Sequence, residues 1–188
     1  GLALCILDSG ADHADLTDEY AAIPQEMRSV ARCFGKEVLR EVNEAEFYAQ
    51  LKQVREQTGD RAVLRALHFF AENRRVAGQK AALKAGDIEG FFAGVLASGR
   101  SSFCYLQNVY TTKNVREQGL SLALCLAERY LTGKSAAWRV HGGGFAGTVQ
   151  AFMKNEEVPG FRALMDGVFG KGACIVLRIR PEGACLVD

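Results

Sequence analysis

The sequence lacks any strong charge imbalance and any long apolar stretch. Its 23 basic and 22 acidic residues leave a net charge of +1, so no overall field favours nucleic acid or an anionic membrane surface. The apolar runs fall well short of the roughly 20 residues that a membrane-spanning helix needs, and the first residues do not read as a secretory leader. We therefore expect a cytoplasmic protein with neither nucleic-acid nor membrane partners.

Cysteine motifs are also missing. The six cysteines are scattered, with no C-x-x-C pair and no histidine at ligand spacing, and most of them stand within apolar runs. This usage indicates a reduced protein without a disulfide framework or a zinc site. Four aspartates and one histidine crowd residues 8–18. A metal site and ordinary capping or turn residues both fit that composition, but the spacing is not that of a calcium loop, so we predict no metal site.

The chain lacks an initiator methionine and opens directly in a strand-like apolar run, residues 2–8. We interpret the sequence as a piece of a longer protein. Its 188 residues suffice for one domain with a substantial core, and we find no repeats, low-complexity segments or linkers. The sequence therefore predicts a single domain over residues 1–188.

Apolar residues recur at helical spacing in six segments, residues 24–34, 43–57, 60–85, 87–99, 115–131 and 158–170. Pro24 suits the first position of the first helix, and Asn43 stands three residues before Glu46, at capping-box spacing. Short apolar or alternating runs predict strands at residues 2–8, 135–140, 148–152, 172–179 and 183–187. This order favours an α+β fold, with an antiparallel sheet covered on one face by helices.

A glycine-rich loop separates two of these strands. Gly142, Gly144 and Gly147 satisfy the G-x-G-x-x-G spacing of a dinucleotide-binding turn, but that site requires a helix directly after the glycines, and here a strand pattern follows. A hairpin turn and a ligand-binding loop remain. Since three consecutive glycines plus a fourth exceed what a hairpin needs, we favour a loop whose backbone a ligand approaches closely.

The residues around this loop resemble a known family. The run R-V-H-G-G-G-F-A-G is similar to the third signature motif of the GHMP small-molecule kinases, in the form R-x-T-G-G-G-F-G-G found in galactokinases. Further segments resemble galactokinase landmarks in the same order along the chain: HADLTDEY, RALHFFAENRRV (for R-A-x-H-x-x-x-E-x-x-R), ALKAGDIEGF and SGRSS. Together they cover almost the whole sequence.

The resemblance implies the C-terminal half of a galactokinase-like sugar kinase, with the corresponding GHMP fold. The enzyme would transfer the γ-phosphoryl group of ATP to the anomeric hydroxyl of galactose or a related sugar. An N-terminal half, absent from this chain, would supply the phosphate loop, the catalytic aspartate and most contacts to ATP and Mg²⁺, so we expect no catalytic residue here. The expected partners are sugar, ATP and that N-terminal domain. The resemblance also implies a sugar-contacting Tyr20 and a glycine loop near the active site, formed by Gly142, Gly143, Gly144 and Gly147.

The sequence departs from the galactokinase pattern at several places. His141 replaces a threonine, Ala146 replaces a glycine, Ile23 and Pro24 replace two arginines, and residues 103–119 do not follow the usual text. These departures leave the sugar open. They also leave open an alternative function, a catalytically inactive protein that senses sugar and ATP.

Three polar residues need separate interpretations. Arg139 and His141 adjoin the glycine loop, and His141 is our candidate for a pH-sensitive group there. His68 lies among apolar residues of the long helix predicted over 60–85, so we interpret it as structural rather than catalytic.

Overall fold

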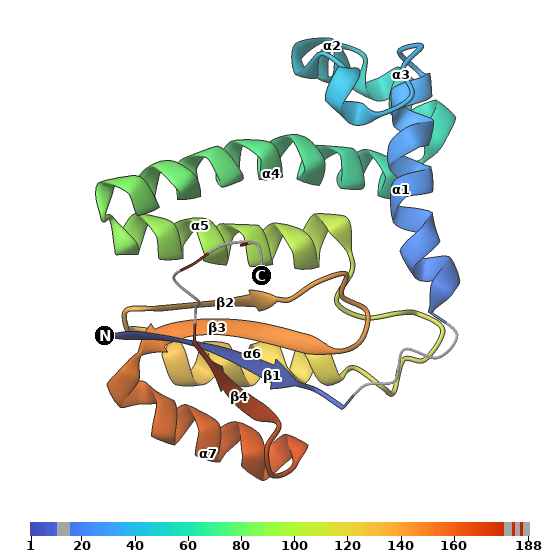
Figure 1. Cartoon of the computed structure of the whole chain (residues 1–188). Helices are drawn as coiled ribbons and strands as arrows, with labels where there is room; N and C mark the ends of the chain where they lie inside the picture. The colour runs from blue at the N-terminus through green and yellow to red at the C-terminus, as the bar shows by residue number, and fades with distance from the viewer. Residues whose placement is uncertain (11–15, 179–181, 183–184, 186–188) are drawn as a thin grey trace.

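The computed structural model describes residues 1–10, 16–178, 182 and 185. Within these residues one antiparallel sheet has the order β2-β3-β1-β4. The strands are β1 (Leu2–Asp8), β2 (Ala136–Val140), β3 (Thr148–Lys154) and β4 (Cys174–Leu177). The first strand of the chain is therefore internal, because it pairs with β3 along its whole length and with β4 on its other side (Figure 1).

Helices cover both faces of this sheet. On one face α6 (Gly119–Leu131) and α7 (Val158–Phe169) enclose the largest core, which contains Leu120, Met153 and Phe161. On the other face α5 (Ile88–Ser101) sets Phe92 and Val95 against Ala137 of β2. The predicted class, an α+β fold with an antiparallel sheet, is confirmed. The sequence prediction placed helices on one face, and the structure adds the second layer.

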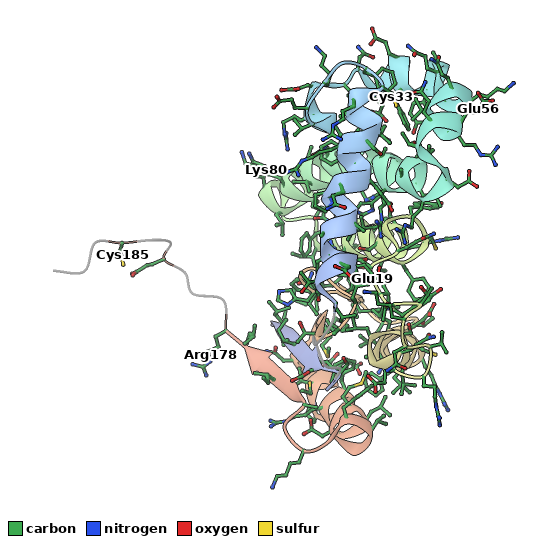
Figure 2. The ribbon with its side chains drawn as sticks, turned by 90° about the vertical axis from the view of Figure 1, so that its right-hand side faces the viewer. Glu19, Cys33, Glu56, Lys80, Arg178 and Cys185 are labelled. Atoms are coloured by element: carbon green, nitrogen blue, oxygen red, sulfur yellow. The ribbon has the colours of Figure 1, made fainter. Side chains whose placement is uncertain are left out.

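A long helix, α4 (Asp60–Ala85), lies along α5 and joins the sheet layers to a separate helical corner (Figure 1). That corner contains α1 (Thr17–Arg32), η1 (Leu39–Glu41), α2 (Glu44–Ala49) and α3 (Leu51–Thr58), packed around the buried Phe47. Figure 2 shows α1 along its length, with Glu19 near its start and Cys33 just beyond its end, in this corner. Two short turns complete the described elements, η2 (Ser102–Leu106, π-helical) and η3 (Asn155–Glu157).

The helix boundaries show where local patterns suffice. The prediction of a helix over residues 60–85 is confirmed, and Gly86 ends it in the left-handed conformation at φ +70°. Asn43 caps α2 as its spacing indicates, since its side chain accepts hydrogen bonds from the N–H groups of Ala45 and Glu46. The segment 43–57, predicted as one helix, is instead two helices that meet at Gln50.

The predicted start of α1 was wrong. The helix begins at Thr17, seven residues before Pro24, so the proline lies inside it and removes one backbone hydrogen bond. Tertiary packing sustains the earlier turns, because Leu16, Tyr20 and Ile23 form a small apolar cluster with residues of the glycine loop. The last predicted strand, 183–187, lies mostly outside the described residues. No helix in the described part of the chain is both long and apolar enough to cross a membrane.

Candidate functional site

The glycine loop, residues 141–147, is the connection between β2 and β3. The backbone N–H of His141 donates to Thr148 O at 2.9 Å and closes the base of this hairpin. The backbone at Gly142, Gly144 and Gly147 has positive φ, and Phe145 also adopts φ +57°. Residues 141–143 are exposed while residues 144–147 are buried. The loop thus has an exposed tip and a buried return limb.

Tyr20 contacts the loop directly, although 124 residues separate the two segments. Its hydroxyl donates to Gly144 O at 2.7 Å, and its ring meets the ring of Phe145 edge-on, with centroids 5.3 Å apart. Burial raises the pKa of the Tyr20 hydroxyl above its ordinary value, so it stays protonated and remains a donor at neutral pH. The structure therefore brings together the tyrosine and the glycines that the resemblance assigned to one site.

Asn108 also contacts the loop directly, and sequence reasoning missed it. Its backbone carbonyl accepts from Phe145 N–H at 2.5 Å, and its Nδ2 donates to Gly143 O at 3.1 Å. Asn108 is 2 % exposed and lies within the segment that departs from the galactokinase pattern. Its contact with the glycine loop is visible only in the structure, where Asn108 lies between the π-helical turn and the loop.

The close approaches that explain two of the glycines come from the protein itself. A Cβ at Gly143 would lie 2.8 Å from Cε1 of Tyr20, and a Cβ at Gly144 would lie 1.8 Å from Asn108 O. Packing therefore accounts for these two glycines without a ligand. At Gly142 nothing lies within 4 Å of the corresponding position, so the exposed tip is where a ligand contact stays a prediction.

Arg139 and His141 flank the loop but serve different neighbours. The guanidinium of Arg139 donates to Ser98 Oγ at 2.5 Å and lies 3.4 Å from Glu72 Oε1, so it points toward α5 and α4 rather than to the loop tip. His141 is exposed, and its Nδ1 lies 3.1 Å from Thr148 Oγ1 across the base of the hairpin. Of the two, only His141 is placed beside the tip.

The motif R-A-x-H-x-x-x-E-x-x-R on α4 supplies a row of polar contacts to the elements around the loop. Arg65, 1 % exposed, bonds Glu26 on α1 at 2.8 Å and the carbonyl of Leu106 at 3.1 Å. His68 Nδ1 lies 2.9 Å from Ser101 Oγ. Because burial lowers the pKa of His68, it is neutral at physiological pH. These contacts support the structural interpretation of His68.

Further along the same row, Glu72 connects three elements. It accepts hydrogen bonds from Ser98 and from Arg75, whose Nε lies 2.7 Å away, and it faces Arg139. Burial raises the pKa of Glu72, but the Ser98 and Arg75 hydrogen bonds outweigh burial and hold that pKa below its ordinary value. The carboxylate is therefore charged at neutral pH and joins α4, α5 and β2.

A cavity of about 410 Å³ opens beside the buried limb of the loop. Phe145 forms one wall, and the polar lining includes Glu19, Arg61 and Gln107. This mixture of an aromatic face with charged and amide groups is compatible with a hydroxyl-rich ligand.

The described residues contain no group of three or more histidine, cysteine or acidic side chains that could hold a metal ion. Asp12, His13 and Asp15 of the acidic segment lie outside the described residues. The assignment of ATP and Mg²⁺ mainly to an N-terminal half stays a prediction.

Comparisons with known proteins agree with the fold and the motifs. No protein-family model matches the chain. The galactokinase of Glaesserella parasuis is 31% identical over 165 residues, which cover 88% of this chain and 41% of that protein. Human galactokinase is 29% identical over 184 residues, which cover 97% of this chain and 43% of that protein.

The fold is shared with a solved relative. The crystal structure of Lactococcus lactis galactokinase complexed with galactose matches 94% of this chain and 44% of its own, with a TM-score of 0.67 at 22% identity. The chain thus spans about two fifths of the length of the relatives it matches. The predicted resemblance is confirmed: over nearly its whole length the chain is similar to the C-terminal half of galactokinases.

Proposed function

We propose that the chain is the C-terminal domain of a galactokinase-like sugar kinase, which transfers the γ-phosphoryl group of ATP to the anomeric hydroxyl of galactose or a related sugar. The observation that carries this proposal is the contact of Tyr20 with the glycine loop, in a chain similar to galactokinases. Phosphoryl transfer depends mainly on positioning and on charge stabilisation, and a loop whose buried limb is held in place suits that task.

Each part of the site has a proposed role. Tyr20 would contact the sugar; because its O–H already donates to Gly144 O, such a contact would use the phenolic oxygen as an acceptor from a sugar hydroxyl. The exposed tip at Gly142 and Gly143 would present backbone N–H groups to the reacting groups. ATP, with Mg²⁺, would supply the phosphoryl group and would be bound mainly by the N-terminal half, which we propose as the domain's partner.

The test compares the full-length protein with the 188-residue chain in a coupled ADP-release assay. We expect galactose-dependent ADP release from the full-length protein and none above background from the chain alone, which lacks the proposed phosphate loop and catalytic aspartate. Glucose serves as the control sugar. Turnover by the chain alone would contradict the two-half arrangement. Saturable galactose binding without transfer by the full-length protein would contradict the kinase and favour the sugar-sensing alternative.

A further inference from the structure

The position of the glycine loop depends on a small number of contacts to distant parts of the chain. Among the described residues, Ser9 bonds Gly147 O, Tyr20 bonds Gly144 O, and Asn108 bonds both Gly143 and Phe145. A loop so rich in glycine has more backbone freedom to lose than other loops. The residues that make these contacts therefore set where its exposed tip lies.

Asn108 makes the most extensive of these contacts. It reaches the carbonyl before Gly144 through Nδ2 and the N–H after Gly144 through its own carbonyl oxygen. Its Oδ1 in turn accepts from the buried hydroxyl of Ser102 at 3.0 Å, which orients the amide so that Nδ2 faces the loop. A single buried side chain and its carbonyl thus span three consecutive loop residues.

The backbone around this contact is unusual on both sides. In the described part of the chain only Gln107 and Phe145 combine a side chain with positive φ, each at +57°. Gln107 directly precedes Asn108, and Phe145 donates to it. Such conformations persist only where the surroundings enforce them. Both residues also line the 410 Å³ cavity, so the strained pair borders the candidate site.

We call Asn108, with its bonds to Gly143 and Phe145, the clamp. It is anchored to the long helix α4 through the residues before it. Ser101, the last residue of α5, contacts His68 of α4, and Leu106, the last residue of the π-helical turn, contacts Arg65 of α4. The turn itself closes through Gln107 N–H to Ser102 O at 2.9 Å. A continuous series of contacts therefore runs from the motif on α4 through Asn108 to the loop.

We propose that Asn108 is a positioning residue for phosphoryl transfer: its amide donates to Gly143 O and holds the tip of the glycine loop at the reacting groups. This inference rests on the proposed kinase function. Asn108 would act through the loop and not by contact with sugar or ATP. A buried asparagine that merely supports the fold would affect stability without lowering kcat per folded molecule.

The experiment uses Asn108→Asp in the full-length protein. The new carboxylate keeps the acceptor for Ser102 but has no donor for Gly143 O, whereas a protonated carboxyl regains one. We expect kcat per folded molecule to fall on the order of tenfold to a hundredfold at pH 7.5, with smaller changes in KM for galactose and ATP. Burial and the facing carbonyl oxygen of Gly143 disfavour the charged form, so the pKa of the new carboxyl should lie well above the ordinary value of about 3.9. The ratio of variant to wild-type kcat should therefore recover severalfold as pH falls toward 5.5.

A matched control is Asn114→Asp, the same change at an exposed position of the same segment. It should leave kcat within about twofold at both pH values. Among the described residues, the ionisable side chains bonded to residues 106–111 are Arg65, at Leu106 O, and Glu19, at Thr111 Oγ1. Because both are present in wild type and variant, the ratio of rates cancels their titration to first order. An Asn108→Asp ratio that is unchanged at pH 7.5, or reduced without recovery at pH 5.5, would overturn the proposal.

Amide hydrogen exchange of residues 141–147 gives a readout that is independent of turnover. At pH 7.5 Asn108→Asp should accelerate exchange in this peptide severalfold, while Asn114→Asp should not. If the wild-type protein transferred no phosphoryl group, the proposed function would fail. The exchange data would then decide on their own whether Asn108 holds the loop, and unchanged exchange would refute the clamp.

Discussion

Gly144→Ala tests whether the protein, rather than a ligand, occupies the space beside the glycine loop. The added Cβ would lie 1.8 Å from the carbonyl oxygen of Asn108 and 2.7 Å from its Nδ2, at a residue with φ +81°. Two penalties therefore combine, since alanine disfavours this conformation and Asn108 must move away. That movement breaks the hydrogen bond from Phe145 N–H to Asn108 O.

Gly133 offers a control that isolates the second penalty. Its φ of +82° matches that of Gly144, but nothing lies within 4 Å of a Cβ there. Gly133→Ala should therefore cost only the conformational penalty, about 1 kcal/mol. Gly144→Ala adds the disrupted buried hydrogen bond, about 1–3 kcal/mol, for a total of roughly 2–4 kcal/mol. At about 2–4 °C per kcal/mol for a chain of this size, Tm should fall by roughly 2–4 °C and 4–16 °C, respectively.

The assay is thermal unfolding followed by circular dichroism, with urea denaturation at 25 °C to obtain the free energies of unfolding. The decisive quantity is the difference between the two variants. If Gly144→Ala and Gly133→Ala destabilise the protein equally, to within about 0.5 kcal/mol, then Asn108 does not occupy this space. The glycine would then be required for its φ alone, and the packing explanation would be refuted.

Three further predictions concern other parts of the molecule. Burial lowers the pKa of His68, so as pH falls the unfolded state takes up a proton on this side chain before the native state does. The stability that His68 contributes is therefore present above about pH 6.5 and is lost as pH falls below that value. The Tm difference between wild type and His68→Asn should change between pH 7.5 and 5, and a constant difference would contradict this prediction. Asn43→Ala should remove the cap of α2 and lower the free energy of unfolding by about 1 kcal/mol. The control Asn73→Ala, in an exposed turn of α4, should be neutral or slightly stabilising. Equal effects of the two substitutions in urea denaturation would refute the capping role of Asn43. A thiol reagent should modify the exposed cysteines rapidly in the native protein and all six only after denaturation. The reason is that Cys5 and Cys174 are buried, and that the hydrogen bond between them, together with burial, raises the pKa of Cys174. Rapid modification of either buried thiol in the native protein would refute this packing. The exposed set is Cys104, Cys125 and Cys185.

Local sequence patterns predicted most of the elements, because helix and strand periodicity depends on neighbours within a few residues. Such patterns identified the helix over residues 60–85, which ends at a glycine, and the Asn43 cap. They also identified the two strands on either side of the glycine loop. Where local and tertiary preferences disagree, the pattern failed. Pro24 suggested a helix start, but packing of Leu16 and Tyr20 against the glycine loop extends α1 by two turns.

For the candidate site, the sequence identified the glycine loop and the Tyr20 segment, through their resemblance to galactokinases. The tertiary structure decided what occupies the space around them. Asn108 follows no periodic pattern and no motif, and it reaches the loop across 35 residues of sequence. The polar residues Arg65, His68 and Glu72 likewise have partners on other elements. Such contacts arise when the chain path brings distant segments together, so no local pattern could reveal that protein atoms, rather than a ligand, lie against Gly143 and Gly144.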